Sequence, residues 1–196
     1  MDKKTIFVLV CLGVWLLWTN TFELPARYDK NSVVRSVPMQ YETVKKPFNH
    51  KGFTIKPVFR FEAEGRLLSK RRYLFGASAK LSPYDYALGW GPMSTHRVLK
   101  DLKIWQWSRW YFYRYKEAPL LPQDMRLNSS NMHLIPANKL IAKKIKKVRK
   151  GKIVKIKGYL VNVSRANGWN WSTSTRRDDT GNQACEIVWV EDIVVQ

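Results

Sequence analysis

The sequence has few acidic residues, few histidines and only two cysteines, and each shortage excludes a class of protein. Fifteen Asp and Glu stand against 35 Lys and Arg, which gives this 196-residue chain a formal net charge of +20. Cys11 lies in an apolar N-terminal run and Cys185 near the other end, so a disulfide scaffold is excluded. The three histidines lack the spacing of zinc ligands, and the sequence has no Gly-rich phosphate loop or serine-hydrolase elbow. We therefore expect no metal ion and no cofactor.

Apolar residues, in contrast, are plentiful. They make up 45% of the chain and include nine Trp and nine Tyr. Disordered chains lack the aromatic residues needed to bury a core, so this composition excludes a disordered protein. At roughly 100–200 residues per domain, the length leaves room for one domain and a tail, which excludes a multi-domain enzyme.

The N-terminal segment predicts export. Lys3 and Lys4 precede an apolar run over residues 5–18. With the residues that continue this run towards Phe22, an anchor of about 17–18 residues lies at the lower limit of the ~17–25 residues that a spanning helix needs. Trp18 and Phe22 suit the far membrane interface, where aromatic side chains are favoured. Because no Ala-x-Ala cleavage pattern follows, we expect an uncleaved anchor whose two lysines stay in the cytoplasm. A cleaved signal peptide and a buried core helix are the alternatives.

The chain therefore divides into three segments. Residues 1–22 form the membrane anchor or signal segment, and residues 23–50 form a linker or loosely packed arm, because prolines interrupt every period there. Residues 51–196 form an exported globular β-rich domain.

Hydrophobic periodicity predicts several strands in this domain. Apolar and polar residues alternate from Phe53 to Gly65, where Pro57 indicates an edge or a bulge. Residues 66–74 fit either a second strand or a turn-rich return. Further strands are expected in the aromatic run 104–115 and in residues 154–161 and 184–190, with irregular loops in residues 82–92 and 168–181.

One helix interrupts the strands. Pro136 fits its first turn or Asn138 its cap, the apolar residues up to Val148 have helical spacing, and Gly151 fits the position after its end. The order of elements predicts a mainly β (α+β) fold, in which a transmembrane helix precedes a small antiparallel β-barrel or curled sheet with one basic amphipathic helix. The helix, the glycine and the segment KIVKIKGYLV suit an OB-like or SH3-like barrel.

Three segments carry a family resemblance. These are SPYDYALGWGPMS, NSSNMHLIPAN and WNWSTSTRRDDTGNQACEIVWVE. With them the sequence resembles a family of uncharacterised bacterial proteins that are membrane-anchored and exported, over most of residues 53–193. The resemblance implies a bacterial origin and a single-unit domain, and it implies no catalytic roles. Together with the anchor it predicts a single-pass protein of the inner membrane whose C-terminal domain lies in the periplasm.

The predicted helix and the strand after it are strongly basic. Residues 139–157 contain no acidic residue, and the candidate polyanion-binding residues are Lys143, Lys144, Lys146, Lys147 and Lys150. A solvated surface is the simpler interpretation. An uninterrupted lysine face is unusual for it, however, because opposite charges three or four positions apart would stabilise the helix. The alternative is a site for a phosphate-bearing lipid or an envelope polymer.

Three weaker candidates lie in the second half of the chain. Cys185 with His133 is a possible thiolate–imidazole pair, although an apolar strand also suits a buried thiol that serves only packing. Arg177, Asp178 and Asp179 suit a structural loop with Arg–Asp pairs, since two adjacent aspartates supply too few oxygens for calcium. Trp169 and Trp171 predict either an exposed stacking platform or a buried plug.

The leading hypothesis is a membrane-tethered, non-enzymatic domain that binds a partner protein or an anionic component of the cell envelope, as an independent unit or as a subunit of a membrane complex. A thiol-dependent enzyme is the first alternative. Nucleic-acid binding outside the cytoplasm by an OB-like barrel is the second, because aromatic side chains and lysines suit single strands.

Overall fold

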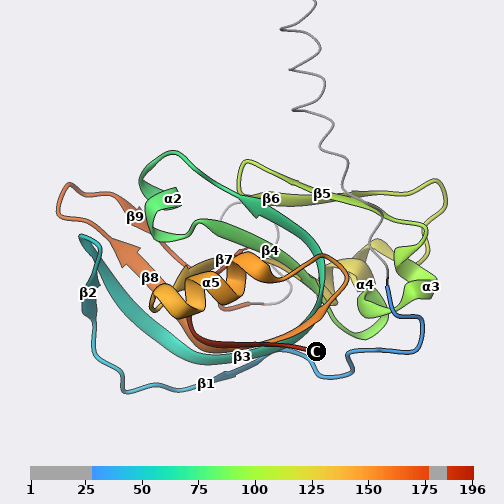
Figure 1. Cartoon of the computed structure of the whole chain (residues 1–196), viewed down its shortest axis with the longest axis horizontal. Coiled ribbons are helices and arrows are strands. Elements are labelled where there is room, and N and C mark those ends of the chain that lie inside the picture. Colours follow the sequence, from blue (N-terminus) through green and yellow to red (C-terminus); the bar gives the residue numbers. More distant parts are fainter. Residues whose placement is uncertain (1–27, 177–184) are drawn as a thin grey trace, which may run out of the picture.

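The computed structural model describes residues 28–176 and 185–196, and Figure 1 shows a large curled sheet with a separate two-stranded sheet and short helices around it. The helices are α2 (Ala77–Leu81), α3 (His96–Leu99), α4 (Pro122–Leu127), α5 (Lys139–Lys147) and the 3-10 turn η1 (Gly91–Ser94). The strands are β1 (Met39–Tyr41), β2 (Phe48–His50), β3 (Phe53–Arg72), β4 (Tyr84–Gly89), β5 (Lys103–Trp107), β6 (Trp110–Arg114), β7 (Ser129–Pro136), β8 (Ile153–Ser164), β9 (Asn170–Trp171) and β10 (Glu186–Val195). The fold is therefore mainly β with a curled sheet, as predicted.

Five strands pair in a closed cycle, which we call the five-strand ring. β3 pairs with β4, β4 with β7, β7 with β10, β10 with β8, and β8 returns to β3. All of these pairings are antiparallel except that of β7 with β10, which is parallel. The parallel pair is possible because α5 and β8 lie between these two strands in the sequence, and a parallel pairing needs a long crossover.

The length of β3 explains how the ring closes. Its first part pairs with β8 through residues 54–66, and its last part pairs with β4 through residues 66–72. Residues 66–72 therefore continue the first strand, which settles the two alternatives that the sequence left open. A register shift against β8 lies between Pro57 and Phe59, so the bulge expected at Pro57 is confirmed.

Two predicted elements differ from the structure. The segment expected as an irregular loop contains β4, whose six residues are all buried. A strand buried on both faces shows no alternation of polar and apolar residues, which is why its period was missed. The aromatic run is a hairpin of β5 and β6 instead of one strand, because the chain turns at Ser108 and Arg109, with φ angles of 49° and 68°. Positive φ at both central residues is the geometry of a tight two-residue hairpin turn.

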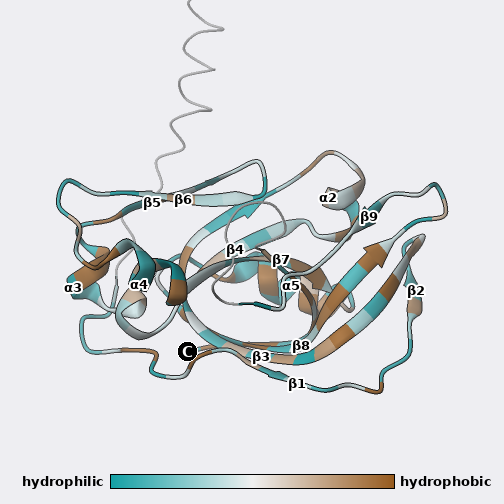
Figure 2. Cartoon of the chain, turned by 180° about the vertical axis from the view of Figure 1, so that it is seen from behind, coloured by the Kyte–Doolittle hydropathy of each residue, from teal (hydrophilic) through white to brown (hydrophobic). Residues whose placement is uncertain are grey.

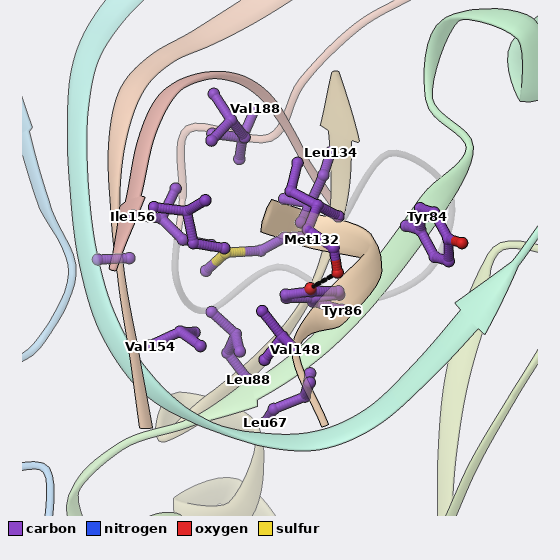
Figure 3. Packing of buried hydrophobic residues seen from close by; sticks show 14 of the residues in the cluster. Leu67, Tyr84, Tyr86, Leu88, Met132, Leu134, Val148, Val154, Ile156 and Val188 are labelled. Carbon is purple, nitrogen blue, oxygen red and sulfur yellow. Dashed lines mark hydrogen bonds between the residues drawn. The ribbon is translucent and has the colours of Figure 1, made fainter. Parts of the chain in front are cut away.

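The main core lies inside the ring. Figure 3 shows Tyr86, Leu88, Met132, Leu134, Ile156 and Val188 converging from four of its strands. α5 adds Ile141 and Ile145 to this cluster, so the helix closes one end of the ring. Along β3 and β8, brown and teal residues alternate in Figure 2, as the sequence period predicted. The outward sides of the sheet are covered by two smaller apolar clusters.

The arm before the ring is extended and attached to it. Within residues 28–50, β1 and β2 add short antiparallel pairings to β3, and Val34 is buried in the main core. The buried Arg66 holds the start of this arm, since its guanidinium donates to the Ser32 carbonyl at 2.7 Å and to the Gly151 carbonyl at 2.8 Å.

The predicted anchor, residues 1–22, lies outside the described residues. In the part of the chain that is described, none of the helices has the length and apolar character needed to cross a bilayer.

Candidate functional site

The basic helix α5 is built as the sequence predicted. Asn138 caps it, with its side-chain oxygen accepting from the Ile141 amide at 3.0 Å, and Pro136 is the last residue of β7 instead of part of the first helical turn. Ile141 and Ile145 are buried at helical spacing, and Val148 follows them into the main core. Packing of these three apolar residues fixes the direction in which the remaining side chains of the helix point.

The lysines of α5 occupy the opposite side of the helix. Lys139, Lys143, Lys146 and Lys147 are exposed, and Lys144 is half-buried. Within the described residues, Lys144 is the one α5 lysine that has a carboxylate in ion-pair range, with its Nζ 3.1 Å from Asp192 Oδ1. The basic surface continues beyond the helix through the exposed Arg149, Lys152 and Lys155, with Lys150 half-buried among them.

We call this set the α5 face, comprising Lys139, Lys143, Lys144, Lys146, Lys147, Arg149, Lys150, Lys152 and Lys155. The structure thus places the five predicted polyanion-binding lysines on one helix and in the residues that directly follow it. The exposed side of α5 is expected to have a positive electrostatic potential, because its lysines lie three or four positions apart and, within the described residues, only Lys144 among them has a carboxylate in ion-pair range.

Lys70, outside the helix, donates hydrogen bonds to the end of α5. Lys70 of β3 donates to three carbonyl groups at the end of the helix, those of Ile145 at 3.1 Å, Lys146 at 2.7 Å and Val148 at 2.9 Å. These acceptors favour the ammonium form of Lys70. Burial, with the positive charge of Lys146, outweighs them and lowers the pKa of Lys70 to about 8. The positive charge of Lys70 therefore adds to the α5 face at neutral pH and is lost in mildly alkaline solution.

A second polar cluster lies on the outward side of β4 and β7. The fully buried Asp85 directs Oδ1 to Arg109 Nη1 at 2.7 Å and lies 3.0 Å from His133 Nδ1. The strand register places Asp85 opposite His133, so the two side chains share one side of the sheet. Trp171 covers His133, with their ring centroids 4.6 Å apart.

Arg109 reaches this cluster from the tip of the β5–β6 hairpin. Its guanidinium also donates to the Ser82 carbonyl at 3.0 Å and lies 3.8 Å from the centre of the Tyr73 ring. Its backbone carbonyl accepts from Asn131 Nδ2 at 2.7 Å. Burial, with the negative charge of Asp85, raises the pKa of Tyr73 to about 12, which keeps this phenol neutral. These contacts fasten the hairpin across β4 and β7.

Cys185 and His133 contact different groups in the structure. Cys185 lies just before β10 and is half-buried, with its Sγ 3.7 Å from Asn131 Nδ2 and 3.8 Å from the Arg109 carbonyl. His133 instead faces Asp85. The thiol therefore contacts Asn131 and Arg109, which attach the hairpin, and the imidazole contacts the carboxylate of Asp85.

The other candidates from the sequence are the Arg–Asp loop and the tryptophan pair. Arg177, Asp178 and Asp179 lie outside the described residues. Trp169 and Trp171 are both half-buried and pack against a cluster that contains Phe53, so the structure favours the plug over the platform. Among the described residues, no group of three or more His, Cys, Asp or Glu side chains has an arrangement that could hold a metal ion.

The comparisons with known proteins add no relatives. No family model matches the chain, and no curated protein or solved structure matches it either.

Sequence reasoning missed the buried carboxylate and its arginine. Asp85 lies in a strand with no periodic signal, and Arg109 lies in a run that was expected to be one continuous strand. The position of Ser108 and Arg109 between two aromatic segments of equal length is compatible with a two-residue hairpin turn. Neither residue is the Gly or Asn that marks such a turn, so the turn could not be recognised.

Proposed function

We propose that this protein is a membrane-tethered, exported and non-enzymatic domain that binds an anionic component of the cell envelope through the α5 face. The observation that carries the proposal is the arrangement of like charges on α5. Lys139, Lys143 and Lys147 are spaced four residues apart, all exposed. Each such pair destabilises a helix by about 0.2–0.5 kcal/mol. A fold that keeps these lysines without acidic neighbours on the helix carries a cost that a bound polyanion removes.

The five-strand ring supports an OB-like barrel in preference to an SH3-like one. It has five main strands, and α5 precedes the fourth of them, β8. OB barrels bind nucleic acids and oligosaccharides on the outward side of their second and third strands. In this chain those strands are β4 and β7, and Arg109 fastens the hairpin over them. This cover argues against nucleic-acid binding on the usual side, and it does not extend to the exposed lysines of the α5 face.

Residues 1–22 provide the tether in this proposal. Lys3 and Lys4 remain in the cytoplasm of a bacterial cell and the ring lies in the periplasm. An alkaline phosphatase fusion after residue 50 is therefore expected to be active. Activity only from a cytoplasmic reporter at the same junction would overturn the location.

Substitution of the basic residues tests the binding function. In the full-length protein held in neutral detergent, Lys143, Lys144, Lys146, Lys147 and Lys150 are changed to Gln, and affinity for fluorescent heparin is measured. Each lysine near an anionic surface contributes on the order of 1 kcal/mol, so we expect the affinity to fall at least ~100-fold. It should also fall steeply with salt in the unchanged protein.

A matched control removes the same charge elsewhere. The control variant changes five exposed lysines outside the α5 face to Gln, namely Lys30, Lys46, Lys56, Lys80 and Lys100. Its net charge falls equally, and its affinity for heparin should fall less than ~5-fold. Equal losses in the two variants would show that only net charge matters and would reject the α5 face as a site. Circular dichroism of both variants checks that each is folded.

The enzymatic alternative has its own test. Cys185→Ala keeps a small side chain beside Asn131 and removes the only thiol in the described residues. We expect this variant to bind heparin as the unchanged protein does. Loss of an envelope phenotype in Cys185→Ala, with folding and heparin binding intact, would favour the thiol-dependent enzyme.

A further inference from the structure

The outward side of the β5–β6 hairpin is an exposed ladder of aromatic and basic side chains. Cross-strand register places Trp105 opposite Phe112 and Lys103 opposite Arg114. Trp107 is 64% exposed, Trp105 41% and Phe112 40%. The rings of Trp105 and Phe112 stack, with centroids 5.5 Å apart. We call Lys103, Trp105, Trp107, Phe112 and Arg114 the hairpin face.

The surroundings of the hairpin face are also cationic and apolar. Arg71 lies over the Trp107 ring, 5.6 Å from its centre. Phe75, in the loop after β3, is 87% exposed, and this loop follows Tyr73, which contacts the hairpin turn at Arg109. Large aromatic side chains in a row, bordered by arginine and lysine, are costly to expose to water and suit a surface that is apolar inside and anionic outside.

The start of the described chain lies close to the hairpin. Tyr28 packs against the outer apolar cluster formed by Leu68, Val98 and Ile104, and the hairpin residues Tyr111 and Tyr113 pack against the same cluster. Five residues, 23–27, separate Tyr28 from the proposed anchor. At no more than about 3.5 Å per residue they span less than ~20 Å. The anchor therefore keeps the side of the molecule that contains Tyr28 and the outer apolar cluster near the bilayer.

We propose that the hairpin face lies on the surface of the membrane that holds the anchor. Trp105, Trp107 and Phe112 enter the interfacial layer, where amphipathic rings are favoured, and Lys103 and Arg114 contact anionic lipid headgroups. This inference rests on the membrane tether of the proposed function. It adds a second contact that fixes the orientation of the ring relative to the bilayer.

Site-directed spin labels in the full-length protein test the orientation. The chain carries Cys11→Ala and Cys185→Ala, and a nitroxide is attached at Trp107→Cys or, as a second position on the ladder, at Arg114→Cys. The control position is Val44→Cys, which is 100% exposed and lies between β1 and β2 in the sequence. In Figures 1 and 2, β1 runs along the edge of the molecule opposite the hairpin of β5 and β6. Each variant is reconstituted in vesicles with and without phosphatidylglycerol.

The ratio of oxygen accessibility to nickel-chelate accessibility reports depth in the bilayer. We expect this ratio to be at least 5-fold higher at position 107 than at position 44, with an intermediate ratio at position 114, and both differences should grow with phosphatidylglycerol. Vesicle flotation separates the two proposals. A chain that floats but has equal ratios at all three positions overturns the hairpin contact and keeps the tether, and a chain that does not float overturns both. If the hairpin face instead binds single-stranded nucleic acid or sugars, the accessibility ratios would be equal at the three positions, which overturns the membrane contact.

Discussion

At the scale of single residues, Arg109 connects parts of the molecule that are distant in sequence. It sits in a turn with positive φ, which is uncommon for a residue with a side chain. Its guanidinium pairs with Asp85 of β4, and its carbonyl accepts from Asn131 of β7. The conformational cost of the turn is therefore offset by contacts that exist only when the hairpin lies across the ring.

The Asp85–Arg109 pair gives a prediction about stability. Asp85→Asn leaves the guanidinium of Arg109 without its carboxylate in a mostly buried position. Breaking a buried ion pair from one side costs about 3–5 kcal/mol, and we expect the lower end because Arg109 is partly exposed. Urea unfolding monitored by tryptophan fluorescence measures the loss.

The double variant Asp85→Asn/Arg109→Met serves as the control for this prediction. Removing both charges avoids an unpaired buried cation, so the double variant should recover much of the lost stability. If Asp85→Asn unfolds at the same urea concentration as the unchanged protein, the pair does not fasten the hairpin.

Lys70 gives a prediction about pH. Its pKa is lowered to about 8 in the folded protein, against 10.5 as the ordinary value. Between these pH values the unfolded chain holds a proton that the folded protein has lost, so the unfolding free energy rises with pH across this window. Below pH 8, where Lys70 is protonated in both states, burial of its charge lowers the unfolding free energy by the full amount. We expect the stability of the unchanged protein relative to Lys70→Met to rise from pH 8 to pH 10.5. A flat difference over that window would contradict the lowered pKa.

At the scale of elements, α5 shows how a helix can tolerate an unfavourable surface. Lysines near its C-terminus interact well with the helix dipole, but Lys139 at its first position does not. Three features compensate, namely the Asn138 cap, the burial of Ile141 and Ile145, and the contacts of Lys70 with the last carbonyls. The stability of α5 therefore comes from its ends and its buried side, and its exposed side is left for binding.

The cap of α5 can be tested directly. Asn138→Ala removes the acceptor of the Ile141 amide and should lower the unfolding free energy by about 1 kcal/mol. Asn138→Asp keeps an acceptor and adds a negative charge beside the helix N-terminus, so this variant should be at least as stable to unfolding as the unchanged protein. Thermal unfolding of the three proteins measures the order. An Asn138→Ala variant as stable as the others would mean that packing alone holds the helix.

At the scale of the whole molecule, local patterns predicted the elements better than their connections. The alternation around Phe53, the helix cap at Asn138 and the bulge at Pro57 are set by neighbouring residues, and all three are found. The full burial of β4 and the turn at Arg109 depend on contacts with residues far away in sequence, so no local period indicates them. For the same reason the lysines of the α5 face were found from sequence, and the Asp85–His133–Arg109 cluster was not.

The part of the chain that a bound polyanion protects decides whether the α5 face is the binding site. Hydrogen exchange of the full-length protein in neutral detergent is measured with and without heparin, followed by peptide mapping. Because heparin relieves repulsion among the lysines of α5, it should stabilise the helix against local opening. We expect slower exchange in residues 139–152, unchanged exchange in β4 and β7, and no slowing in the variant with the five lysines of the α5 face changed to Gln. Protection centred on β4 and β7, or on the hairpin with residues 139–152 unchanged, would contradict the assignment of the α5 face as the binding site.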